Sequence, residues 1–106
     1  MIKVSFLKKG GDIVGFELSG HSGYAEQGED IVCSAVSSVA YMVANTVTEI
    51  IGEKASITLD DGYMKFIPEK TSDNIQILFK GMALHLNALA EQYEQYLCCK
   101  EKLFKE

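Results

Sequence analysis

The feature that most constrains the fold of this 106-residue chain is a change in the spacing of its apolar residues. Residues 2–8 alternate apolar and polar side chains, which is the pattern of a half-buried strand. A turn signal at 10–12 separates them from residues 13–19, which can form the partner strand. Apolar residues then recur at helical spacing from 31 to 51. The first half of the chain therefore predicts a hairpin followed by a helix.

The second half repeats this order. Residues 54–59 and 63–67, joined by an Asp-Asp-Gly turn, predict a second hairpin that ends at Pro68. A second helix is expected to start at 71–73. The last ten residues leave two alternatives open, a frayed continuation of this helix or a short edge strand near 96–99.

Each predicted helix has an apolar face that should pack on a sheet. The first face is expected to consist of Ile31, Ala35, Val39, Met42, Val43, Val47, Ile50 and Ile51. The second is expected to consist of Ile75, Leu78, Phe79, Met82, Leu86, Leu89 and Tyr93.

The order β-β-α-β-β-α predicts one α+β domain over residues 1–106. Hairpins are antiparallel, so we expect a mainly antiparallel sheet of about four strands with both helices on one face. A single sheet covered on one side leaves its other side open. A homodimer is one way to cover it, and we expect that partner.

Composition narrows the function classes. The net charge is −5 and the pI is about 5.0, which disfavours direct nucleic-acid binding because that needs a basic surface. The longest apolar runs, 31–36 and 82–86, are far below the roughly 20 residues of a membrane span. The N-terminus has no signal-peptide core. Three cysteines, two of them adjacent, do not make a disulfide framework, so a reducing cytoplasm is expected.

The residues that can carry chemistry flank a glycine-rich loop. His21 ends the second strand, and Cys33 lies in the first turn of the first helix. Asp30 can cap this helix by accepting from the amides of Val32 and Cys33. The helix dipole and nearby amides favour a thiolate at Cys33, and an imidazole brought back to it could take the proton. The same amides could stabilise an oxyanion. Spacing alone equally fits an inert buried cysteine and a surface histidine.

The residue string makes the interpretation specific. Gly20-His21-Ser22, followed by Gly-Glu-Asp-Ile-Val-Cys-Ser-Ala-Val-Ser over 28–37, resembles the ribosomal-processing cysteine protease family Prp. The family pattern is Gly-His-small and then Gly-x-Asp-Ile-Val-Cys-small-Ala/Gly-x-Ser. Ser22 and Ser34 stand where alanine is usual, and both keep the side chain small. The resemblance extends over the whole chain in length and element order.

The resemblance assigns roles residue by residue. Cys33 matches the nucleophile and His21 the general base, while Gly20, Asp30 and Ser37 match supporting positions. Asp30 could cap the helix, orient His21, or do both, and the sequence leaves these alternatives open.

The resemblance also implies a cellular function. The family are homodimeric endopeptidases that remove the N-terminal extension of a large-subunit ribosomal protein, cutting after a hydrophobic motif that ends in phenylalanine. The loop from Ser22 to Glu29 would act as a lid, with Gly23 and Gly28 as hinges and Tyr24 as a candidate peptide contact. No metal, other cofactor, nucleic acid or membrane is expected as a partner.

Two other functions share some of these features. A thiol redox sensor would use Cys33 with Cys98 or Cys99 as the resolving thiol, without His21. A non-catalytic ribosome-assembly or peptide-binding module would use the sheet alone. Fold class does not decide among these functions.

Overall fold

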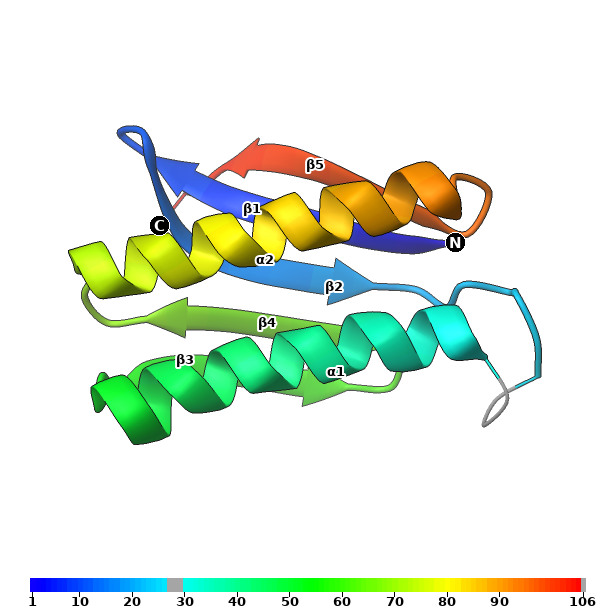
Figure 1. Ribbon diagram of the computed structural model, residues 1–106. Helices are drawn as coiled ribbons and strands as arrows, with labels where there is room; N and C mark the ends of the chain where they lie inside the picture. The colour runs from blue at the N-terminus through cyan, green and yellow to red at the C-terminus, as the bar shows by residue number, and fades with distance from the viewer. Residues whose placement is uncertain (27–29, 106) are drawn as a thin grey trace.

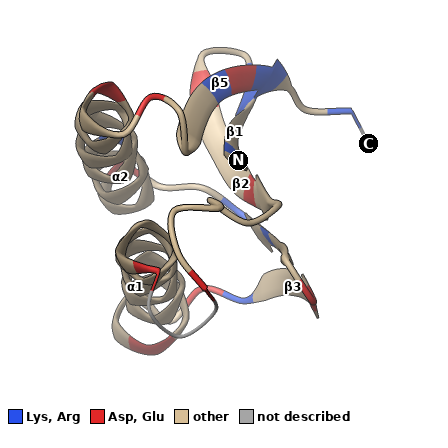
Figure 2. Cartoon of the chain, turned by 90° about the vertical axis from the view of Figure 1, so that its right-hand side faces the viewer, with Lys and Arg blue, Asp and Glu red and all other residues tan. Residues whose placement is uncertain are grey.

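The computed structural model describes residues 1–26 and 30–105, and in them a sheet of five strands carries two long helices on one face (Figure 1). The elements are β1 (Ile2–Lys9), β2 (Asp12–Ser19), α1 (Ile31–Asn45), the π-helix η1 (Thr46–Ile51), β3 (Ala55–Asp60), β4 (Tyr63–Pro68), α2 (Asp73–Gln92) and β5 (Leu97–Leu103). Seen from the end in Figure 2, the helices form one layer and the strands the other. The predicted α+β class, both hairpins and the helical layer are confirmed.

The strand count differs from the prediction at the C-terminus. The sheet order is β3-β4-β2-β1-β5, and β5 pairs in parallel with β1 from Ile2↔Leu97 to Lys8↔Leu103. The edge-strand alternative for the last ten residues is therefore correct, but the strand is longer than expected. Its sequence lacks clean alternation because most of its side chains are exposed at the sheet edge.

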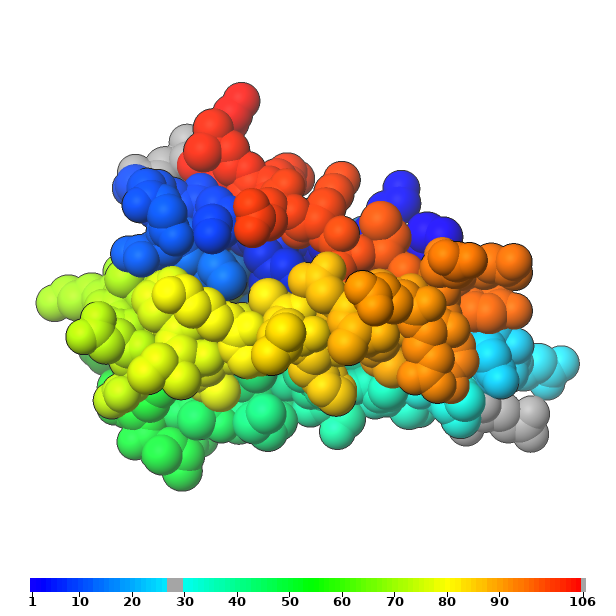
Figure 3. All heavy atoms as spheres, turned by 45° about the horizontal axis from the view of Figure 1, so that its top comes forward, coloured from blue at the N-terminus to red at the C-terminus, as the bar shows by residue number. Residues whose placement is uncertain are grey.

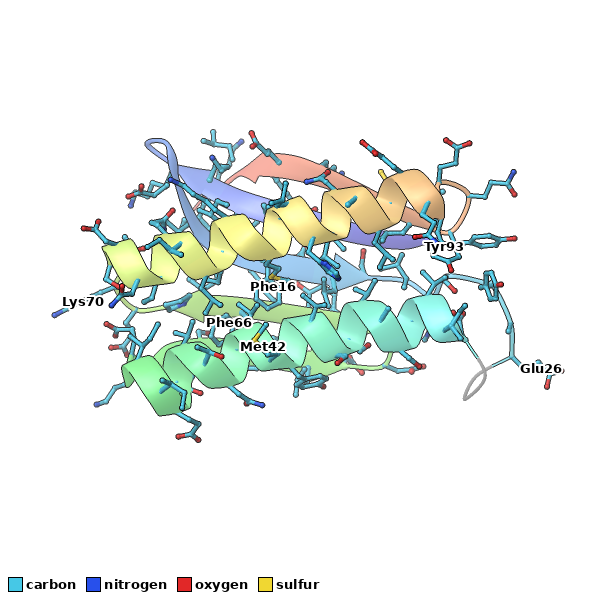
Figure 4. The ribbon with its side chains drawn as sticks, in the orientation of Figure 1. Phe16, Glu26, Met42, Phe66, Lys70 and Tyr93 are labelled. Atoms are coloured by element: carbon cyan, nitrogen blue, oxygen red, sulfur yellow. The ribbon has the colours of Figure 1, made fainter. Side chains whose placement is uncertain are left out.

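The core lies between the sheet and the helices. Ile2, Val4 and Phe6 of β1 all face it, as the alternation predicts. Three buried phenylalanines form its centre, with ring centroids 5.4 Å apart for Phe16 and Phe66 and 6.2 Å for Phe16 and Phe79. Figure 4 shows Phe16 and Phe66 in the region between the two helices. The start of α1 packs on this core.

The buried face of α1 is rotated from the predicted one. The helix buries Val32, Val36, Ala40, Val43 and Ala44, and η1 adds Val47. In contrast, the expected inner residues Ile31, Met42 and Ile50 are 52%, 54% and 80% exposed. The prediction was correct for Val43 and Val47 but wrong for these three residues, because this helix is apolar on most sides and its periodicity does not specify which side faces the sheet. The inner face of α2 agrees better, with Ile75, Phe79, Met82 and Leu86 buried.

The helix from Ile31 to Ile51 is long and apolar enough, by length and composition alone, to cross a membrane. The same segment packs one face on the sheet, as core helices of this composition do. Its end is set by Gly52, which adopts the left-handed conformation (φ 83°) typical of a helix C-cap.

The face of the sheet away from the helices is polar. At its centre Glu17 accepts a hydrogen bond from the Tyr63 hydroxyl at 2.5 Å and lies 3.7 Å from the Lys102 ammonium. Together with burial, this bond and the carboxylate's charge raise the pKa of Tyr63 to about 12. This face therefore does not offer the apolar surface that a homodimer would be expected to cover.

Candidate active site

Asp30 organises the start of α1. Its Oδ1 accepts hydrogen bonds from the amides of Val32 at 3.0 Å and Cys33 at 2.9 Å, which is the predicted N-cap. Its Oδ2 accepts from the hydroxyl of Ser22, which is itself buried. The cap therefore also ties the loop after β2 to the helix that carries Cys33.

The hydrogen bonds keep the buried Asp30 carboxylate charged. Burial by itself would raise its pKa, but the Ser22 hydroxyl, the amide and thiol of Cys33 and the Val32 amide outweigh it. The net result is a pKa lowered to about 2. Of the two roles left open by the sequence, the structure shows the cap: both carboxylate oxygens are engaged with the loop and the helix.

Cys33 lies in the first turn of α1, half-buried, with its sulfur accepting from the backbone amide of Ser22 at 3.4 Å. This contact places a donor beside the predicted nucleophile. The predicted oxyanion role of the helix amides is wrong for this turn. The amides of Val32 and Cys33 donate to the Asp30 side chain, and the amide of Ser34 donates to the Asp30 carbonyl at 3.0 Å.

His21 follows a glycine that the fold requires. Gly20 has φ 88°, and a Cβ on it would lie 2.4 Å from the carbonyl oxygen of Met1. Its amide donates to the carbonyl of Gly62 at 2.9 Å, which ties the end of β2 to the β3–β4 turn. The His21 side chain is 61% exposed, and its Nε2 lies 4.0 Å from Asp61 Oδ1. Within residues 1–26 and 30–105, no hydrogen bond joins this ring to the Cys33 sulfur.

A cavity of about 430 Å³ brings the predicted site residues together. Its lining includes both predicted catalytic residues, the three supporting residues and one predicted hinge: Cys33, His21, Gly20, Asp30, Ser37 and Gly23. Ser22 instead contacts Asp30 and Cys33, as described above. Gly28, the other predicted hinge, lies outside the described residues.

Sequence reasoning missed the apolar wall of this cavity. It is formed by side chains from four different segments, Leu18, Tyr41, Leu59 and Met64. Leu59 lies on the helix side of β3 yet is 56% exposed, since β3 is the sheet edge. The alternation along 54–59 predicts on which face of the sheet Leu59 lies. It does not predict that this face borders the cavity with Cys33 and His21.

Tyr24 lies at the end of the domain, next to the aromatic end of α2. Its ring centroid is 5.8 Å from that of Tyr93 and 5.1 Å from that of Tyr96, both in edge-on geometry. Figure 4 shows Tyr93 at the same end of the molecule as Glu26 of the loop. The loop is therefore anchored to the domain on both sides of Gly23, by Ser22 and by Tyr24.

The other cysteines differ from Cys33 in their surroundings. Cys98 and Cys99 lie on β5, which is separated from β3 and β4 by β2 and β1, and all three cysteines are free thiols. Burial, with a further contribution from Cys98, raises the pKa of Cys99 to about 11. A thiol of that pKa is protonated at neutral pH and resolves a sulfenic acid poorly. Across the described residues, no three His, Cys, Asp or Glu side chains group together as a metal site.

A half-buried cysteine in the first turn of a helix, with a histidine on the same cavity, fits the nucleophile and base of a cysteine protease. The chain belongs to the cysteine protease Prp family, because the family model of that description matches residues 1–98. The resemblance inferred from the sequence is thereby confirmed, and the protein is a cysteine protease.

Named relatives agree in sequence and in fold. The ribosomal processing cysteine protease Prp of Bacillus subtilis (strain 168) is 32% identical over 92 residues, covering 80% of this chain and 82% of that protein. A crystal structure of the S. aureus ribosomal processing protease Prp, in complex with a covalently linked product peptide, has a TM-score of 0.88 at 25% identity and covers 96% of this chain and 100% of that one. A Streptococcus mutans structure has a TM-score of 0.85 at 31% identity, covering 98% and 99%.

Proposed function

We propose that this cysteine protease removes the N-terminal extension of a large-subunit ribosomal protein precursor in the cytoplasm, cutting after a short hydrophobic motif that ends in phenylalanine. Membership of the Prp family supports the ribosomal substrate, because the B. subtilis and S. aureus relatives are ribosomal processing proteases. The single structural observation that carries the proposal is that His21, Cys33 and an apolar wall line one cavity.

In the proposed reaction Cys33 is the nucleophile and His21 the general base. The imidazole takes the thiol proton, and the thiolate attacks the carbonyl carbon of the peptide bond. The carbon–nitrogen bond breaks as the imidazolium returns its proton to the leaving amine. Water, deprotonated by the imidazole, then hydrolyses the thioester and frees the thiol. The cycle uses no cofactor.

The surroundings of Cys33 support this role. The positive end of the α1 dipole and the Ser22 amide both favour a negatively charged sulfur. The charged Asp30 opposes it and also accepts from the neutral Cys33 thiol, besides the Ser22 hydroxyl and two helix amides. Asp30 thus stabilises the position of the helix start at an electrostatic cost to the thiolate. Ser37, one helical turn after Cys33, borders the same cavity.

The cavity wall fits a hydrophobic peptide. Leu18, Tyr41, Leu59 and Met64 offer apolar contacts within the cavity. Because β3 is an edge strand, an extended peptide has access to this wall from the side of the sheet. Side chains that precede the scissile bond are expected to occupy it.

A homodimer forms part of the proposal, and the helices supply a more suitable surface for it than the polar face of the sheet. Val39 and Met42 of α1 border an apolar groove with Ile77 and Leu78 of α2. Met42 is 54% and Ile77 70% exposed, which is unusual for side chains of this kind on a monomer surface. In Figure 3 the side chains of α2 form a continuous ridge across the molecule, with those of α1 below it. Light scattering at micromolar concentration is expected to give twice the 11.7 kDa chain mass.

The test is cleavage of a synthetic ribosomal precursor segment with a hydrophobic motif ending in phenylalanine, followed by mass spectrometry. We expect one cut after the phenylalanine, and complete loss of cleavage in Cys33→Ala and in His21→Ala. Cys98→Ser serves as the thiol control and should cut at the wild-type rate. Cleavage that survives Cys33→Ala would eliminate the proposed mechanism, and cutting at unrelated positions would eliminate the proposed substrate.

A further inference from the structure

The imidazole of His21 rests on the turn between β3 and β4. A Cβ placed on Gly62 would lie 2.8 Å from His21 Nε2 and 3.4 Å from both Cδ2 and Cε1, so this edge of the ring faces the bare Cα of the glycine. On the same side, Nε2 lies 4.0 Å from Asp61 Oδ1. The turn thus approaches the proposed base in two ways. The missing side chain of Gly62 leaves the space that the ring occupies, and the Asp61 carboxylate lies beside Nε2.

The backbone holds this arrangement in place. The Gly20 amide donates to the Gly62 carbonyl at 2.9 Å, directly before the histidine. The pairing of β2 with β4 ends at Ser19↔Tyr63, so the chain reaches His21 immediately beyond a fixed register. Within the turn, Asp60 Oδ1 accepts from the Asp61 amide at 2.7 Å. The backbone that leads into His21 is therefore tied to the turn.

The carboxylates that line the cavity, Asp30 and Asp60, are already engaged by other donors. Asp60 Oδ1 accepts from the Asp61 amide, as described above. Asp30 binds the Ser22 hydroxyl with one oxygen and two helix amides with the other. A base that must carry a proton needs an orienting partner on the nitrogen that does not react. In the described part of the chain, the carboxylate placed beside the His21 ring is that of Asp61.

We propose that the β3–β4 turn positions the general base, and we call this turn the seat of His21. Asp61 and Gly62 are positioning residues that hold the imidazole with Nε2–H toward the turn. Nδ1 is then the nitrogen that takes the Cys33 proton. This inference rests on the proposed roles of His21 and Cys33. The Asp61 carboxylate stabilises the imidazolium that forms. Since the Asp61 side chain is 89% exposed, solvent screens the pair and the glycine surface is the stronger of the two contributions.

The first test compares two glycines. Gly62 and Gly10 are hairpin-turn glycines with nearly equal φ, 64° and 60°, but a Cβ on Gly10 would meet nothing within 4 Å. Alanine at either position should lower the melting temperature by a similar amount. Only Gly62→Ala should lower kcat, by about tenfold or more, because its methyl group displaces the ring. Equal kcat values in the two folded variants would overturn the role of Gly62.

The second test removes the carboxylate. Asp61→Asn is expected to lower kcat about fivefold with KM unchanged, and Asp61→Glu to restore most of the loss. The matched control is Asp12→Asn, the same change at the first residue of β2, directly after the turn of the other hairpin, which should leave kcat at the wild-type value. A kcat for Asp61→Asn equal to that control, or a change in KM alone, would overturn the role of Asp61.

A second measurement separates this inference from the proposed substrate. The rate at which iodoacetamide alkylates Cys33, followed by mass spectrometry, reports on proton removal by His21 without any peptide. We expect slow alkylation in His21→Ala and Gly62→Ala and wild-type rates in Gly10→Ala and Asp12→Asn. If no variant cuts the ribosomal peptide but this pattern of alkylation rates holds, the proposed substrate is wrong and the positioning of His21 by the turn is supported. If the peptide is cut and Gly62→Ala alkylates like Gly10→Ala, the seat is wrong and the protease stands.

Discussion

The two sides of the active site, the helix wall around Cys33 and the turn wall around His21, are built very differently. On the helix side, Asp30, Ser22 and Cys33 are buried or half-buried and linked by hydrogen bonds through both carboxylate oxygens. On the turn side, His21 and Asp61 are 61% and 89% exposed and 4.0 Å apart. The nucleophile is therefore held in a rigid network, whereas the base is held mainly by contact with a turn. Stability should depend on the first wall and catalytic rate on both.

The largest expected effect on stability comes from Asp30→Ala. It removes the helix cap and the partner of Ser22, and we expect a loss of about 2 kcal/mol in the free energy of unfolding, measured with urea. Asp61→Asn, on the exposed wall, should change the same quantity by less than about 0.5 kcal/mol. Equal losses in the two variants would contradict the contrast between the walls.

Acid should weaken the helix side selectively. The folded pKa of Asp30, about 2, lies below its ordinary value of 3.8, so its contribution to stability is present above pH 4 and is lost as the pH falls toward 2. The loss should be smaller than that of Asp30→Ala, because a protonated carboxyl group keeps an acceptor oxygen. Urea unfolding of wild type and Asp30→Asn at pH 5 and pH 3 measures it. The stability difference between the two proteins should shrink at the lower pH, and a constant difference would contradict the assignment.

Ser22→Ala tests the link between loop and helix. The hydroxyl donates to Asp30 and accepts from the Tyr24 amide at 3.0 Å, and we expect its removal to cost about 1 kcal/mol. Alanine fits the space, so the variant should fold. Ser34→Ala provides the control and should leave the free energy of unfolding unchanged. Ser34 follows Cys33 in the first turn of α1 and is exposed. A neutral Ser22→Ala would show that the backbone amide contact to Cys33 alone positions the loop.

The smallest expected effect is that of Tyr24→Ala. Its ring contacts with Tyr93 and Tyr96 lie at the margin of the domain, and the side chain is 43% exposed. We expect a loss of about 0.5 to 1 kcal/mol, measured by urea unfolding, and faster proteolytic cleavage of the loop. Tyr41→Ala, on the cavity wall, should instead raise KM for the peptide and leave the loop as resistant to proteolysis as in wild type. Unchanged loop proteolysis in Tyr24→Ala would contradict its role as an anchor.

The sequence predicted the parts of the site that are local in the chain. Asp30, Val32 and Cys33 are within three residues of one another, so capping chemistry alone places the cysteine in the first helical turn. The motif around His21 and Cys33 was sufficient to identify the family. The side of α1 that faces the sheet was not predictable in this way, because apolar residues on several sides make more than one orientation compatible with burial.

By itself, then, the sequence determined the order of strands and helices, the N-cap and the motif that carries the chemistry, since each depends on residues close together in the chain. Only the tertiary structure decided which residues lie against His21 and which form the apolar wall of the cavity. Asp61 and Gly62 are about forty positions from the histidine, and the pairing of β2 with β4 brings them to it. The parallel pairing of β5 with β1 was likewise decided by the tertiary structure. Strand register is a property of two distant segments at once, and neither segment's own pattern contains it.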